Sequence, residues 1–212
     1  NAFAKIIYFN SEWSREELRL GLLACALLPS AGQKYKIQGV QQNPQHAAFK
    51  EDLIVHAIIR DCLKLSNKDV ASVGAVLNHL DRVDVLLMDL SRDHDPIVIG
   101  RLLKDIGSEW KLSFALATVR SFWLNGCNPE EELVVREYLS KLSNLLLYID
   151  GIGLSEAWQF KPLLTGKEIQ EILCIKPGTA IGKHLAQLLD WQFINPNGTK
   201  EEALQFLLLI KK

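Results

Sequence analysis

Apolar residues recur every three or four positions along most of the chain, which is the period of an amphipathic α-helix. This pattern is clear over 47–65, and the stretch 110–124 is apolar on enough sides to predict a central, buried helix. Runs in which apolar and polar residues alternate, joined by tight hairpin turns, would indicate strands, and they are nearly absent. The pattern therefore predicts an all-α protein.

Capping residues indicate where the helices begin. Ser14, Thr165 and Thr199 are each followed three residues later by glutamate, the spacing of a capping box. Asp95 and Asn128 each stand directly before a proline, which places a capping side chain ahead of a residue suited to the first helical turn. We therefore expect helices to start at these five positions.

Glycine and proline divide the helices into two groups. The predicted helices of the first group end near 28, 65, 80, 107, 124 and 148, and the residues from 30 to 46 are predicted to form a loop. Two glycines near 150 then interrupt the pattern, and shorter helices follow. The sequence predicts a helical body domain over 1–150 and a smaller helical tail domain over 151–212.

Positive and negative charges nearly cancel over the whole chain, but they are unevenly distributed along the sequence. The 212 residues contain 24 basic and 25 acidic side chains, so the net charge is -1. This excludes a protein coated in positive charge but permits a local basic strip. From Lys161 onward, seven lysines face five acidic residues, so any basic strip is expected in the tail.

Cysteine spacing and apolar run length bear on the environment of the protein. The four cysteines lie dozens of residues apart, so they are expected to be reduced, mostly buried thiols of an intracellular protein. No apolar run approaches the roughly 20 residues that cross a bilayer. The chain begins with Asn1 and shows no signal peptide, so we expect a piece of a longer protein.

Several residues could suggest an enzyme, but each has a simpler interpretation. Asp93 and Asp95 have the spacing of a two-metal carboxylate pair, although Asp95 before proline is explained by helix capping. His79 with Asp81, and His94 with Asp95, lack the further ligands that a metal-dependent phosphohydrolase needs. A cysteine–histidine nucleophile pair has no recognisable local frame. No catalytic residue and no metal site are predicted.

The segment 173–185 holds the most informative local chemistry. A short helix ends at a Pro-Gly turn, and the next helix begins with small residues whose backbone amides are open to a ligand. Such a turn can accept a phosphate of a nucleic-acid backbone. The candidate RNA-binding residues are Lys176, Gly178, Thr179 and Lys183, together with Lys167.

An alternative interpretation of this segment is purely structural and remains open at this stage. Gly178 and Gly182 would then only allow two helices to approach closely. The side chains expected to point inward in that case are Ile181, Leu185, Leu188 and Leu189.

Motifs in the tail carry a resemblance to a known family. They are Lys-Pro-Leu-x-x-Gly-Lys-Glu at 161–168, Lys-Pro-Gly at 176–178, Trp-Gln at 191–192 and Pro-Asn-Gly-Thr at 196–199. Upstream, 26–29, the Tyr-Lys at 35–36 and 102–111 fit the same pattern in the same order. The chain thus resembles the C-terminal body and tail region of class II CCA-adding enzymes, the CCA tRNA nucleotidyltransferases of fungi and plants.

The resemblance implies a larger enzyme with head, neck, body and tail, which adds C, C and A to tRNA 3′ ends without a nucleic-acid template. The family's head carries metal-binding carboxylates for Mg²⁺ with CTP and ATP, and its neck carries an acidic-arginine motif. Neither pattern occurs in this sequence. The 212-residue segment alone is therefore expected to be inactive and to depend on a head and neck.

The expected role of this segment is to hold tRNA, which is its expected partner. By resemblance, the compartments would be mitochondrial, nuclear and cytoplasmic, and no membrane association is expected. Two alternatives remain: an all-helical protein-interaction scaffold without activity, and a self-contained enzyme that uses His94 or a cysteine.

Overall fold

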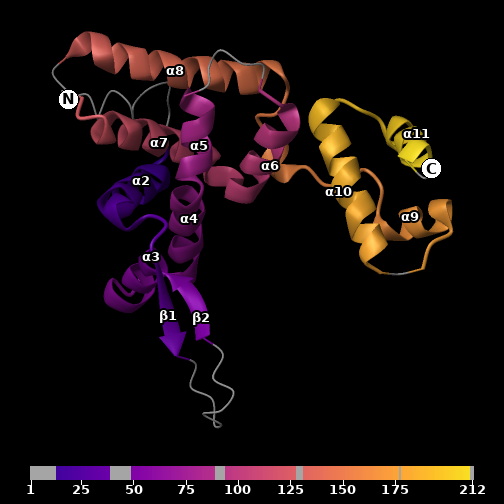
Figure 1. Cartoon of the computed structure of the whole chain (residues 1–212), viewed down its shortest axis with the longest axis horizontal. Helices are drawn as coiled ribbons and strands as arrows, with labels where there is room; N and C mark the ends of the chain where they lie inside the picture. The colour runs from indigo at the N-terminus through magenta and orange to yellow at the C-terminus, as the bar shows by residue number, and fades with distance from the viewer. Residues whose placement is uncertain (1–12, 39–48, 89–93, 128–130, 177, 211–212) are drawn as a thin grey trace. The chain divides into compact units, whose positions relative to one another are not determined.

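The computed structural model describes residues 13–38, 49–88, 94–127, 131–176 and 178–210 (Figure 1). They form a helical protein that divides into two compact units. The first comprises Asn1–Asp89 and Ser108–Leu142, and the second comprises Leu90–Gly107 and Ser143–Lys212. The predicted all-α class is confirmed, with one small hairpin added.

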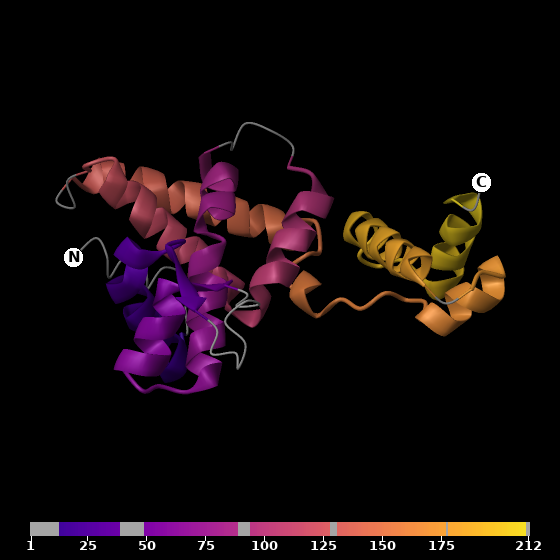
Figure 2. The ribbon, with the colours of Figure 1, turned by 60° about the horizontal axis from the view of Figure 1, so that its bottom comes forward.

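The first unit is built around α7 (Trp110–Leu124), the helix that the sequence predicts to be central and buried. Every residue from 112 to 119 is buried, and Ser113 Oγ donates a hydrogen bond of 2.8 Å to the Val76 carbonyl. α7 lies beside α8 (Glu132–Gly151), where Phe122 packs on Val135 (Figure 1, Figure 2). The remaining helical elements of this unit are α2 (Arg15–Leu27), η1 (Leu28–Ser30), α3 (Ile54–Ala57), the π-helical η3 (Ile58–Cys62), α4 (Asn67–Asn78) and α5 (Leu80–Met88). The short η4 (Gly107–Glu109) and α8 both contain residues of each unit.

A two-stranded antiparallel hairpin departs from the prediction. β1 (Lys34–Gln38) pairs with β2 (Phe49–Leu53), so the loop predicted over 30–46 and the start of the helix predicted over 47–65 were wrong there. Phe49 and Leu53 stand four positions apart, a spacing that places two residues on one face of a helix and also of a strand. Periodicity alone therefore could not separate the two structures.

The second unit combines one helix from the middle of the chain with those of its C-terminal part. α6 (Pro96–Ile106) packs against α10 (Thr179–Ile194) and against η5 (Ala157–Gln159). Arg101 forms an ion pair with Asp190, and Lys104 donates to the Phe160 carbonyl. This grouping differs from the predicted division at 150/151, because the contacts of α6 with α10 join residues far apart in sequence.

The C-terminal helices have a small core of their own. α9 (Gly166–Leu173), α10 and α11 (Lys200–Ile210) pack around a set of fully or nearly fully buried apolar side chains. These are Leu164, Ile169, Leu173, Leu188, Ala203 and Leu207. All six lie within 151–212, the range that the sequence predicts as a tail domain; that domain division stays a prediction.

Four of the five predicted helix starts are confirmed. The hydroxyls of Ser14 and Thr165 each accept from the backbone amide three residues on, and Thr199 forms the same reciprocal pair with Glu202. The carboxylate of Asp95 accepts from the Ile97 amide at 2.8 Å. The fifth start, at Asn128, lies outside the described residues.

Candidate nucleic-acid interface

The predicted phosphate-accepting turn falls between α9 and α10 (Figure 1), and its Pro177 lies outside the described residues. α9 ends at Cys174, which adopts the left-handed conformation at φ 54°. α10 follows Gly178, which is extended and makes no side-chain cap for the helix. Because no described side chain caps the first turn of α10, the amides of Thr179 and Ala180 remain available to a ligand, whereas the Ile181 amide donates to the Gly178 carbonyl at 3.2 Å.

The structure brings the candidate residues to the ends of two adjacent helices. Lys176, Gly178, Thr179 and Lys183 are all exposed, around the start of α10. At the start of α9, a Cβ added to Gly166 would lie 3.1 Å from Ile181 Cγ2. Lys167, the next residue, is exposed and belongs to the turn of α9 nearest to α10.

Glycine positions distinguish the two interpretations of this segment. A Cβ added to Gly178 or Gly182 would meet no atom within 4 Å. By contrast, a Cβ at Gly100 would lie 2.3 Å from Phe193 Cγ, and one at Gly198 would lie 2.5 Å from Trp191 Cη2. Close helix packing therefore explains Gly100, and packing of a turn on Trp191 explains Gly198, but close packing does not explain Gly178 and Gly182.

The apolar residues of α10 that the structural interpretation predicts to point inward are buried only in part. Ile181 and Leu188 are buried, whereas Leu185 and Leu189 are half-buried. Lys183 and Gly182 lie on the exposed side of the same helix. α10 thus presents an apolar face to the tail core and an exposed face with Gly182 and Lys183 to solvent.

The lysines of this region differ in whether their ammonium groups form ion pairs with carboxylates. Lys200 forms an ion pair with Glu168, and it is the main cause that lowers the pKa of that carboxyl to about 2, followed by hydrogen bonds from Thr165. Among the described residues, no carboxylate lies within ion-pair distance of Lys167, Lys176 or Lys183. These three ammonium groups are therefore available to phosphates.

A pH test follows from the Glu168–Lys200 pair. Because the folded-state pKa of Glu168 is depressed, its stabilising effect is present above about pH 4.5 and is lost as the pH falls through about 2. We expect the melting temperature of wild type to exceed that of Glu168→Gln at pH 6, and the difference to shrink toward pH 2. A difference that is equal at pH 6 and pH 2 would contradict this interpretation.

The tail motifs other than the turn have structural roles, which sequence reasoning missed. The buried amide of Gln192 accepts from the Leu163 amide at 3.0 Å and donates to the Lys161 carbonyl at 3.1 Å. Trp191 stacks on Phe206 at a ring-centroid distance of 5.9 Å and covers Gly198. These contacts hold 161–163 and the turn at 195–199 against α10.

The other candidates from the sequence do not assemble into a site. Asp95 is engaged as a helix cap, and Asp81 forms an ion pair of 2.7 Å with Arg120. His79 lies at the end of α4, with Nδ1 3.4 Å from a guanidinium nitrogen of Arg82. Within the described ranges, no group of three or more histidine, cysteine or acidic side chains is arranged to hold a metal ion. Asp93 lies outside those ranges.

The cysteines are free, as expected, but they are not mostly buried. Cys62 and Cys174 are exposed, while Cys25 and Cys127 are half-buried. Burial raises the pKa of the Cys25 thiol to about 11, which leaves it protonated and unreactive near neutral pH. The prediction of buried thiols was wrong because the exposed pair lies at helix ends, where few neighbours can cover a side chain.

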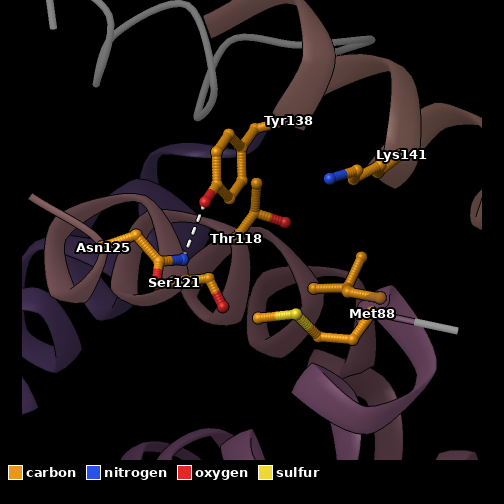
Figure 3. Close-up of a pocket in the computed structure, with 7 residues that line it drawn as sticks. Met88, Thr118, Ser121, Asn125, Tyr138 and Lys141 are labelled. Atoms are coloured by element: carbon orange, nitrogen blue, oxygen red, sulfur yellow. Dashed lines mark hydrogen bonds between the residues drawn. The ribbon is translucent and has the colours of Figure 1, made fainter. Parts of the chain in front are cut away.

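A small hollow in the first unit does not suit a nucleotide. It lies between α5, α7 and α8 and has a volume of about 60 Å³, room for a few water molecules (Figure 3). The lining residues include Met88, Lys141 and Tyr138, whose hydroxyl accepts a hydrogen bond of 2.8 Å from Asn125.

None of the described helices is both long and apolar enough to cross a membrane.

Comparison with curated proteins identifies relatives along most of the chain. It is 26% identical over 198 residues to tRNA nucleotidyltransferase cca2 and 28% identical over 162 residues to tRNA nucleotidyltransferase cca1, both of Schizosaccharomyces pombe. It is also 26% identical over 174 residues to the mitochondrial CCA tRNA nucleotidyltransferase of Saccharomyces cerevisiae. The matches cover 92%, 71% and 79% of this chain.

The matched region is only a part of each relative. The alignments span 37% of cca2, 30% of cca1 and 31% of the Saccharomyces cerevisiae enzyme, so the chain spans about a third of their length. No family model and no solved structure matches the chain. The resemblance suggested by the tail motifs is confirmed by these relatives.

Proposed function

Since the chain is related to the fungal CCA tRNA nucleotidyltransferases over most of its length, we propose that it is the C-terminal, tRNA-holding portion of such an enzyme. The partial coverage of the relatives supports a portion rather than a whole. The observation that supports the tRNA-holding role is the open, glycine-containing start of α10 with Lys183 on that helix and Lys176 just before it, neither in a described ion pair.

This face suits contact with an RNA backbone. Gly178 and Gly182 leave room for an approaching phosphate, and the first amides of α10 point along the helix axis toward it. Thr179 adds a hydroxyl donor, and Lys176 and Lys183 add positive charges that attract a phosphate regardless of the base attached to it. Such contacts recognise shape and phosphate rather than sequence, as an enzyme that acts on many tRNAs requires.

Nucleotide addition itself is proposed to take place in the portion of the enzyme that this chain does not contain. Mg²⁺, CTP and ATP would bind there, because the described part of this chain does not bring together the carboxylates that two metal ions need. The present segment would keep the tRNA in place while the 3′ end grows. The compartment stays a prediction; the Saccharomyces cerevisiae relative is named as mitochondrial.

Charge reversal at the turn tests the proposal. We expect Lys176→Glu combined with Lys183→Glu to weaken tRNA binding by at least tenfold. The double variant should also reduce the slope of log affinity against log salt by about 2, because two phosphate contacts are lost. Filter binding or fluorescence anisotropy over a salt series measures both quantities.

A matched variant controls for total charge. Lys64→Glu combined with Lys68→Glu changes the net charge equally, at exposed positions of the first unit. We expect its affinity and slope to stay near the wild-type values. Equal affinities and slopes for wild type and the Lys176/Lys183 variant would contradict the proposal and favour the protein-interaction scaffold.

A further inference from the structure

We draw no further inference here: the strongest candidate, the exposed Arg101 of α6 with its ion pair to Asp190 of α10, would only extend the nucleic-acid interface already described, and the carboxylates of Asp95 and Asp105 close to it would repel a phosphate.

Discussion

Incubated with tRNA lacking its 3′ end, CTP, ATP and magnesium, the 212-residue chain should incorporate no nucleotide. Nucleotidyl transfer needs carboxylates that hold metal ions near the reacting phosphate, and the acidic residues in the described part are otherwise engaged or scattered. Asp95 caps α6 and Asp81 binds Arg120. Removing such metal ligands from an enzyme abolishes turnover rather than slowing it slightly.

Labelled CTP and ATP, with resolution of the tRNA products on a gel, measure this outcome. The Saccharomyces cerevisiae CCA tRNA nucleotidyltransferase is the positive control for the tRNA and the nucleotides. Addition of C or A by the purified chain would contradict the assignment of chemistry to another portion, and loss of that addition in Asp95→Asn would make Asp95 a catalytic residue rather than a helix cap. If addition depended on His94 or a cysteine, the self-contained enzyme would be the correct alternative.

The same substitution at two glycines of the second unit should have opposite effects on stability. Gly100→Ala should lower the free energy of unfolding by about 1–3 kcal/mol, because its Cβ would lie 2.3 Å from the ring of the buried Phe193. Gly182→Ala should raise it by about 1 kcal/mol, because alanine favours a helix and the site is open. Urea unfolding followed by circular dichroism measures both.

Comparison of the two alanine variants shows whether the glycine in α10 serves close helix packing or leaves room for a ligand. A loss of stability in Gly182→Ala comparable to that of Gly100→Ala would show that the glycine serves close packing after all. Phe193→Leu combined with Gly100→Ala is a useful check, because a smaller side chain should relieve the overlap and recover part of the lost stability.

Local signals in the sequence predicted much of the helical structure. The caps at Ser14, Asp95 and Thr165 depend only on residues within one turn, so they could be recognised without knowing the fold. Helix α7 could be predicted because it is apolar on most of its sides. The exposed lysines of the α9–α10 turn were likewise identified from short-range spacing.

Features that depend on distant residues could not be predicted in the same way. Strand pairing joins β1 to β2 with Lys34 opposite Leu53, and the packing of Gly100 on Phe193 joins α6 to α10. The role of Gln192 was also missed, because its two backbone partners precede it by about thirty residues. A buried glutamine with two backbone contacts leaves no periodic signal in a sequence.

Binding of tRNA by the 212-residue chain over a salt series tests the central claim most directly. Each phosphate contact releases about 0.9 counterion, so log affinity falls by about 0.9 per contact for each tenfold rise in salt. If Lys167, Lys176 and Lys183 each contact a phosphate, raising the salt from 50 to 200 mM should therefore weaken binding roughly 40-fold. A chain that binds no tRNA at 50 mM salt, or whose affinity does not change across the series, would contradict the account.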